Sequence, residues 1–180
     1  MTKPIFIIGF PGSGKTTICN ALKNKIGSRY EFVDLDDYIT ERIGMTIREF
    51  FAKKGEQAFR TLESESIKEL ACKNNIIIAC GGGTPCFGNN METMNNAGKT
   101  ILLTVSEERL FSRLLSGRDR RPLIATMNPD ELKYYISHTL AERSKYYSKA
   151  SFSFSAENLE DEMQIEATIT DFIKTFGLRP

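Results

Sequence analysis

A glycine-rich segment near the start of the chain constrains the fold more than any other feature. Residues 9–16, which read GFPGSGKT, match the pattern G-x-x-x-x-G-K-[ST] over its full length. The apolar run Ile5–Ile8 before it suits a buried parallel strand. In the segment Lys15–Ile26 after it, apolar residues recur every four positions, as on one face of a helix. A strand, a glycine turn and a helix in this order predict a phosphate-binding loop in an α/β fold.

The residue types of this loop suit a nucleoside triphosphate. Glycines let the backbone turn sharply and direct successive N–H groups at phosphate oxygens, and the following helix adds its own unpaired N–H groups. Lys15 is expected to bridge the β- and γ-phosphates, and the Thr16 hydroxyl to ligate Mg²⁺. A chance match is the alternative, and the flanking strand and helix argue against it. Thr17 is expected either to contact the α-phosphate or to cap the helix. The predicted nucleotide-binding residues of the loop are Gly12, Ser13, Gly14, Lys15, Thr16 and Thr17.

Along the rest of the chain, short apolar runs alternate with longer segments of helical period. This alternation predicts an α/β fold in which helices cover both faces of a parallel sheet. No linker suggests a second domain, so residues 1–180 are expected to form one domain. Strands are predicted at 5–8, 32–33, 76–79, 100–105 and 152–154, and helices at 15–26, 38–43, 47–52, 56–71, 91–96, 107–115, 131–147 and 160–176.

Composition excludes several classes of protein. The 24 Lys and Arg residues balance 23 Asp and Glu residues, whereas a nucleic-acid-binding protein usually has a strong basic excess. No apolar stretch approaches the ~20 residues of a membrane-spanning helix. The four cysteines form no CxxC pair, so they are interpreted as reduced thiols that fill the core of a cytoplasmic protein. We expect a monomer without nucleic-acid or membrane partners.

Two aspartates follow the second predicted strand. Proteins with this type of phosphate loop usually carry an acidic residue after another core strand, for Mg²⁺. Here the strand 76–79 is followed by Cys80 and three glycines, with no carboxylate. Because both turns lie at the carboxyl edge of the sheet, Asp34 is expected to hold a magnesium-bound water. Asp36 is expected to accept a hydrogen bond from an incoming hydroxyl and to orient or deprotonate it. The alternative is that Asp36 and Asp37 cap the next helix.

Two arginines lie on the apolar faces of predicted helices. Arg60 shares a stripe with Glu63 and Ile67, so its guanidinium is expected to point inward and to pair with Glu63. The alternative is an exposed Arg–Glu pair on the helix surface. Arg143 lies seven residues after Ile136, again on an apolar face. An inward-pointing arginine needs an anion, and a substrate carboxylate fits its planar fork.

Together these segments resemble the shikimate kinase family. The resemblance spans residues 3 to about 150, in the family's order and spacing. It implies a nucleoside-monophosphate-kinase-like fold, with a five-stranded parallel sheet in the order 2-3-1-4-5 between two layers of helices. The segments that carry it are 9–16, Asp34-Leu35-Asp36, Phe59-Arg60 with Glu63, Gly81-Gly82-Gly83, Arg121-Pro122-Leu123 and Arg143.

The resemblance also implies an activity, which is transfer of phosphate from ATP to the 3-hydroxyl of shikimate, on the route to chorismate and aromatic amino acids. A helical insertion at about 37–73 would bind shikimate, and a mobile lid at about 117–129 would close over it. The implied catalytic residues are Lys15, Asp36 and Arg121, with Arg121 reaching the transferred phosphoryl group. Arg113 would stack near adenine. The implied shikimate-binding residues are Asp36, Arg60, Gly81, Gly82, Gly83 and Arg143.

Two features depart from the family's pattern. The lid is a residue or two shorter than in some members, and Ala156-Glu157-Asn158 stands where many members have a basic or Asn-Pro segment. Thr84-Pro85-Cys86 has no assigned role, and His138 is interpreted as a surface residue.

Another small-metabolite kinase, such as a gluconate kinase, is one alternative function. A non-catalytic nucleotide-binding protein is another.

Overall fold

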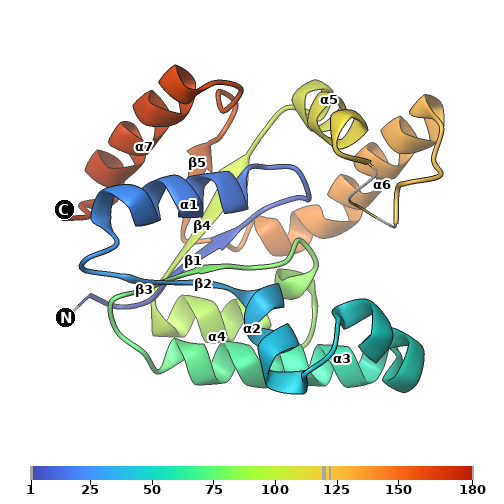
Figure 1. The fold of residues 1–180 in the computed structure, drawn as a ribbon, viewed down its shortest axis with the longest axis horizontal. Coiled ribbons are helices and arrows are strands. Elements are labelled where there is room, and N and C mark those ends of the chain that lie inside the picture. Colours follow the sequence, from blue (N-terminus) through green and yellow to red (C-terminus); the bar gives the residue numbers. More distant parts are fainter. Residues whose placement is uncertain (1, 119–120, 122, 180) are drawn as a thin grey trace.

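The structure is a computed structural model that describes residues 2–118, 121 and 123–179. Its centre is a parallel sheet of five strands in the order β2-β3-β1-β4-β5, which confirms the predicted topology (Figure 1). Each strand lies within two residues of its predicted position. The strands are β1 (Ile5–Ile8), β2 (Glu31–Asp34), β3 (Ile76–Ala79), β4 (Lys99–Thr104) and β5 (Phe152–Ser155).

Helices cover both faces of the sheet, in three layers (Figure 1). One face carries α1 (Lys15–Ile26) and α7 (Glu162–Phe176), and the other carries α2 (Leu35–Ile43), α3 (Ile47–Ala71) and α4 (Asn90–Ala97). A last pair, α5 (Glu107–Ser116) and α6 (Pro129–Tyr147), packs together beside the sheet, and a short 3₁₀ turn, η1 (Thr84–Cys86), follows β3.

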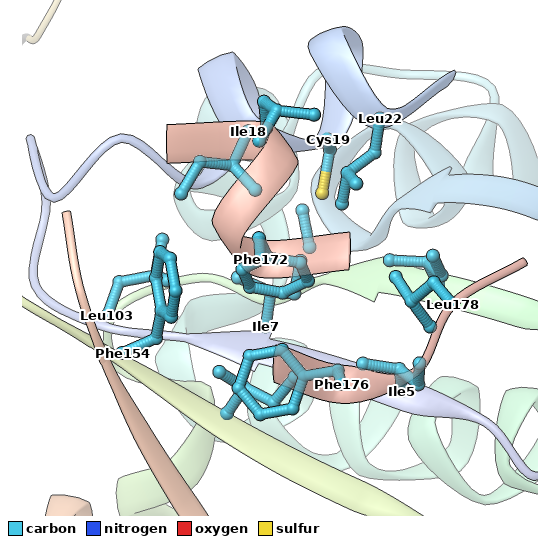
Figure 2. Close-up of a cluster of buried hydrophobic side chains, with 14 of the residues drawn as sticks. Ile5, Ile7, Ile18, Cys19, Leu22, Leu103, Phe154, Phe172, Phe176 and Leu178 are labelled. Atoms are coloured by element: carbon cyan, nitrogen blue, oxygen red, sulfur yellow. The ribbon is translucent and has the colours of Figure 1, made fainter. Parts of the chain in front are cut away.

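The alternation of side chains along β1 divides the core in two. Ile5 and Ile7 point toward α1 and α7, and Figure 2 shows them packed with Phe172 and Phe176. Phe6 and Ile8 lie in the second cluster, with residues of α2, α3 and α4. All four residues of β1 are fully buried. A strand that is apolar on both faces is therefore held at the centre, and the phosphate loop leaves from its carboxyl end.

A third apolar cluster fixes the outer wall of the loop region. It joins the phosphate loop to α5, α6 and the connection between them. Its buried members are Phe10, Leu110, Leu114, Ile124, Leu132 and Ile136.

The structure decides two expectations about local features, one at the start of α2 and one within α3. Helix α2 begins at Leu35, and its N-cap is Asp34, whose side chain accepts a hydrogen bond from the Asp36 N–H at 3.0 Å. The capping alternative for Asp36 and Asp37 is therefore wrong. The prediction of two helices, at 47–52 and 56–71, is confirmed within α3, because a kink at Gly55, whose φ of 80° is not helical, separates two helical segments.

The cysteines are free thiols, as predicted, but only two of them fill the core. Cys19 and Cys80 are buried, whereas Cys72 is exposed and Cys86 is partly exposed. The core interpretation is wrong for Cys72 because it caps the end of α3 at the surface.

None of the helices in the described part of the chain combines the length and apolar character that a membrane crossing needs.

Candidate active site

A cavity of about 650 Å³ opens at the carboxyl edge of the sheet. Ligands of open α/β sheets bind at this edge, where the turns after parallel strands meet. The cavity brings together segments that are far apart in the sequence. Predicted site residues that line it are Gly12, Gly14, Lys15, Thr16, Thr17, Asp34, Asp36, Gly81, Gly82, Arg113 and Arg121.

The phosphate loop has the backbone that its glycines predict. Gly12 and Gly14 adopt φ values of 84° and 92°, which side-chain-bearing residues rarely adopt. Nζ of Lys15 donates hydrogen bonds of 2.9 Å to the carbonyl oxygens of Gly9 and Phe10, so the lysine lies back along its own loop. Burial lowers the pKa of Lys15 to about 8, although nearby acidic groups partly oppose this. The ammonium is therefore poised to gain from an anionic ligand.

Ser13 and Thr16 lie on different sides of this loop. The Ser13 side chain is buried, and its hydroxyl has no hydrogen-bond partner within the described residues. Thr16 is exposed and lines the cavity, so its hydroxyl can reach a ligand.

The two aspartates take different positions. Asp34 uses a carboxylate oxygen to cap α2 while it lines the cavity, and burial raises its pKa. Asp36 is exposed where it lines the cavity, and the protein around the cavity still removes part of the water from its carboxylate. This desolvation, and after it the charges of Asp34 and Glu63, raise the pKa of Asp36 to about 6. At neutral pH Asp36 is mostly ionised and can accept a hydrogen bond.

The three glycines after β3 each lie against one of the predicted substrate-binding side chains. A Cβ on Gly81 would lie 3.5 Å from Oδ1 of Asp36. On Gly82 it would lie 3.0 Å from Nη1 of Arg143, and on Gly83 3.3 Å from Nη2 of Arg60. The glycine segment thus brings one carboxylate and two guanidinium groups, from three separate helices, around a single turn of backbone.

Arg60 is held firmly in this arrangement. Nη1 donates to Oε2 of Glu63 at 3.0 Å, and Nη2 to Oε1 of Glu56 at 3.3 Å. Its guanidinium carbon lies 3.8 Å from the centroid of the Phe87 ring. The side chains of Arg60 and Glu63 are only 19% and 2% exposed, so the alternative of an exposed surface pair is wrong.

The pairing of Glu63 extends to residues for which the sequence predicted no role. The Thr84 hydroxyl donates to Oε1 of Glu63 at 2.6 Å, and Nδ2 of Asn90 donates to the Thr84 carbonyl oxygen at 2.9 Å. All three residues are buried. Both oxygens of the buried Glu63 carboxylate are therefore satisfied, as a charge away from water requires.

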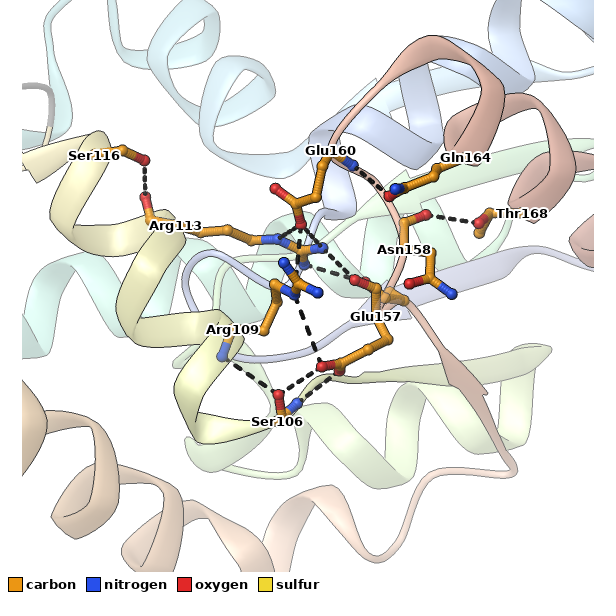
Figure 3. A network of polar contacts seen from close by, with 10 residues as sticks. Ser106, Arg109, Arg113, Ser116, Glu157, Asn158, Glu160, Gln164 and Thr168 are labelled. Carbon is orange, nitrogen blue, oxygen red and sulfur yellow. Dashed lines mark hydrogen bonds and ion pairs between the residues drawn. The ribbon is translucent and has the colours of Figure 1, made fainter.

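Arg113 ties the segment after β5 to helix α5 at the rim of the cavity (Figure 3). Its guanidinium donates to Oε1 of Glu160 at 2.8 and 3.0 Å, and to the carbonyl oxygens of Ala156 and Glu157 at 3.1 and 2.9 Å. Glu157 in turn accepts from the backbone and hydroxyl of Ser106. The segment that departs from the family's pattern is thereby fixed beside the phosphate loop.

The connection between α5 and α6 forms the remaining wall. Arg121 lines the cavity, and its Nη1 donates to the Gly117 carbonyl oxygen at 3.5 Å. Leu123 is 71% exposed, whereas Ile124 is buried in the third cluster. Pro122, which contributes to the resemblance, lies outside the described residues.

A phosphate loop on a 2-3-1-4-5 parallel sheet, in one cavity with two arginines and the Asp36 carboxylate, defines a P-loop kinase of small metabolites. The shikimate kinase family model matches residues 11–174. The chain is 42% identical to a shikimate kinase of Bacteroides thetaiotaomicron, over 92% of this chain and 93% of the relative. It is 41% identical to that of Phocaeicola vulgatus, over 94% and 96%. The chain belongs to the shikimate kinase family.

Solved structures agree with this assignment. The shikimate kinase from Bacteroides thetaiotaomicron superposes with a TM-score of 0.91, at 40% identity, covering 98% of this chain and 99% of the other. Shikimate kinase from Acinetobacter baumannii, solved in complex with shikimate, gives a TM-score of 0.79 at 28% identity, covering 99% and 97%.

Proposed function

We propose that the chain transfers the γ-phosphoryl group of ATP to the 3-hydroxyl of shikimate, giving shikimate 3-phosphate and ADP. The observation that carries this proposal is the arrangement of Asp36, Arg143 and Arg60 against three consecutive glycines beside a phosphate loop. A compact acceptor with one carboxylate and several hydroxyls matches these charges. Family membership and the relative solved with shikimate support the same acceptor.

The ATP phosphates bind along the loop, with backbone N–H groups of Gly12, Ser13 and Gly14 directed at them. Lys15 leaves the carbonyls of Gly9 and Phe10 and moves to the β- and γ-phosphates. The anion raises the pKa of Lys15 again from about 8, because an opposite charge favours the protonated form. Binding of ATP thus relieves the unfavourable burial of this ammonium.

Mg²⁺ fits the donors that face the phosphates. Among the described residues, no group of three or more His, Cys, Asp or Glu side chains could hold a metal on its own. Mg²⁺ prefers one or two protein oxygens together with phosphate oxygens and waters. The Thr16 hydroxyl would supply a protein oxygen, and the Asp34 carboxylate would hold a magnesium-bound water. When bound, the ion neutralises charge that develops on the phosphate oxygens.

Shikimate binds with its carboxylate between Arg60 and Arg143. Planar guanidinium groups bind a carboxylate with paired hydrogen bonds, which fix its orientation as well as its position. Asp36 accepts a hydrogen bond from the ring hydroxyls, and the backbone of Gly81, Gly82 and Gly83 borders the ring. Alignment of the attacking hydroxyl in this way can contribute several kcal/mol, on the order of 7–11 at its upper range.

The connection at about 117–129 closes as a lid and brings Arg121 to the transferring phosphoryl group. A guanidinium there stabilises the charge of the transition state, and closure excludes the water that would otherwise accept the phosphoryl group. The helical segment 37–73 supplies Arg60 and so acts as the shikimate-binding insertion. Arg113 borders the adenine.

An ADP-release assay with Mg-ATP tests this function, using shikimate, quinate, gluconate and nucleoside monophosphates as acceptors. Stimulation by shikimate alone is the expected result. Stimulation by gluconate would instead favour another metabolite kinase of the same fold. ATP binding without stimulation by any acceptor would favour a non-catalytic nucleotide-binding protein.

Two further parts of the proposal concern the state of the protein. We expect it to work in the cytoplasm, where ATP is supplied and where its four free thiols stay reduced. We also expect a monomer, and the molar mass in solution from light scattering would test this.

A further inference from the structure

The last residue of α6 contacts two parts of the proposed shikimate site at once. Tyr147 is 5% exposed, and its ring packs in the core cluster beneath α3 and α4. Its hydroxyl donates a hydrogen bond of 2.7 Å to the carbonyl oxygen of Gly82. Arg143 precedes Tyr147 by four residues on the same helix, so the two side chains share one face.

The hydrogen bond to Gly82 has a consequence for the neighbouring peptide group. The carbonyl of Gly82 and the N–H of Gly83 belong to one planar trans peptide, in which they point in opposite directions. Since Tyr147 holds the carbonyl toward the core, the N–H of Gly83 is directed away from it. Glycine imposes little backbone preference of its own, so an external contact is needed to keep one orientation.

Tyr147 also lies beside Arg143. The Arg143 charge and a hydrogen bond from its guanidinium both favour an ionised phenol, although burial prevails and raises the pKa of Tyr147 to about 12. The phenol therefore stays protonated and keeps its hydrogen for Gly82. Nη1 of Arg143 would lie 3.0 Å from a Cβ on Gly82, so all three groups meet at one point.

We propose that Tyr147 is a positioning residue, which fixes the Gly82–Gly83 peptide and the Arg143 guanidinium for the carboxylate and hydroxyls of the acceptor. The inference rests on the proposed function, since it concerns the acceptor half of that site. It does not extend to the phosphate loop, because Tyr147 contacts no residue of the ATP-binding segment 12–17 in its hydrogen bonding.

Tyr147→Phe is the direct test, because phenylalanine keeps the buried ring and removes only the hydroxyl. Tyr146→Phe is a matched control, as the Tyr146 ring lies beside the ammonium groups of Lys145 and Lys149, and not in the cavity. We expect the KM for shikimate to rise about tenfold in Tyr147→Phe, the size expected for a lost buried hydrogen bond. The KM for ATP should change less than about twofold, and Tyr146→Phe should match the unaltered chain.

A second readout separates positioning from a general loss of packing. The preference for shikimate over its uncharged methyl ester should fall in Tyr147→Phe, because Arg143 is less well oriented. An unchanged shikimate KM in a chain that turns over shikimate would overturn this inference alone. Equal rises in the KM values for shikimate and ATP, with a lower Tm, would assign Tyr147 to packing and also overturn it. Failure of the unaltered chain to phosphorylate shikimate would overturn the proposed function, and this inference with it.

Discussion

The hydroxyl of Thr84 donates a hydrogen bond of 2.6 Å to Oε1 of Glu63, and both side chains are buried. The other carboxylate oxygen of Glu63 accepts from Nη1 of Arg60 at 3.0 Å. Thr84 is therefore separated from the Arg60 guanidinium by a single carboxylate, although the two residues belong to different elements. This relationship gives a role to the segment after the glycines, for which the sequence suggested none.

Thr84→Val should weaken both the fold and the binding of shikimate. Valine keeps the shape of threonine but leaves one oxygen of a buried carboxylate without a donor, which costs about 1–3 kcal/mol. We expect the free energy of unfolding to fall by that amount and the KM for shikimate to rise several-fold. Denaturant unfolding and steady-state kinetics would measure the two effects.

Thr61→Val is the control for this substitution. Thr61 lies on the same helix as Arg60, but it is exposed, and within the described residues its hydroxyl donates to the Gln57 carbonyl oxygen of its own helix. If both variants behaved like the unaltered chain, the Glu63–Thr84 contact would have no part in holding Arg60.

Asp36→Asn should stabilise the fold while it lowers activity. The pKa of Asp36 is raised from 3.8 to about 6 in the folded chain, so the folded state binds the proton more tightly than the unfolded state. Ionisation therefore lowers stability progressively from pH 3.8 to 6, and the full loss is present above pH 6. At pH 7.5 the variant should melt at a higher temperature than the unaltered chain. Turnover should fall on the order of 10²-fold or more, within the range of general acid–base catalysis.

Asp37→Asn provides the comparison for Asp36→Asn. Asp37 is the exposed neighbour in the first turn of α2, where a negative charge favours the helix. The Asp37→Asn variant should therefore have a slightly lower melting temperature than the unaltered chain and the same turnover. A lower melting temperature of Asp36→Asn at pH 7.5 would show that the Asp36 carboxylate is favourably solvated, against this account.

The pH dependence of kcat/KM should have two limbs that belong to different substrates. Asp36 must be ionised to accept a hydrogen bond, so kcat/KM for shikimate should fall as the pH drops through about 6. Lys15 must be protonated to bind phosphate, so kcat/KM for ATP should fall as the pH rises through about 8. In the pH profile of kcat, the fall at alkaline pH should occur at a higher pH than in the profile of kcat/KM, because bound ATP raises the pKa of Lys15. A flat profile between pH 5 and 9 would contradict both assignments.

Arg121→Ala should lower kcat far more than it raises either KM. A guanidinium that acts on the transferring phosphoryl group contributes mainly in the transition state, where its loss costs on the order of 10²-fold or more. Arg118→Ala, at an exposed position of the same connection, serves as the control. Equal changes in kcat and KM for Arg121→Ala would assign this residue to ground-state binding instead.

The features that the sequence predicted well are those that local pattern encodes. The phosphate loop is a contiguous motif, and the buried strands β1 and β3 are short apolar runs that turn residues end. Arg60 and Arg143 could be predicted as inward-pointing because helical spacing places them beside apolar residues. The sequence did not single out the helix cap after β2, because the position of a cap depends on where the preceding strand stops, and several aspartates lie near that point.

The residues that the sequence did not reveal act through contacts between distant segments. Thr84 meets Glu63 across 21 positions and Tyr147 meets Gly82 across 65. Phe87 stacks on Arg60 from the loop after η1, and nothing in its neighbours distinguishes it from an ordinary core aromatic. Such partners are fixed by how helices pack on the sheet, so they follow only from the folded structure.

We propose that the shikimate carboxylate binds between Arg60 and Arg143, and one comparison tests this central proposal directly. The ratio of kcat/KM for shikimate to that for its methyl ester, which keeps the ring hydroxyls but carries no charge, would be measured in the unaltered chain and in Arg60→Ala. We expect a ratio on the order of 10² or more in the unaltered chain, from the loss of a charged hydrogen-bonded pair, and a ratio that falls at least tenfold in Arg60→Ala. The same ratio in both proteins would contradict the account, because the arginine would then bind something other than the carboxylate.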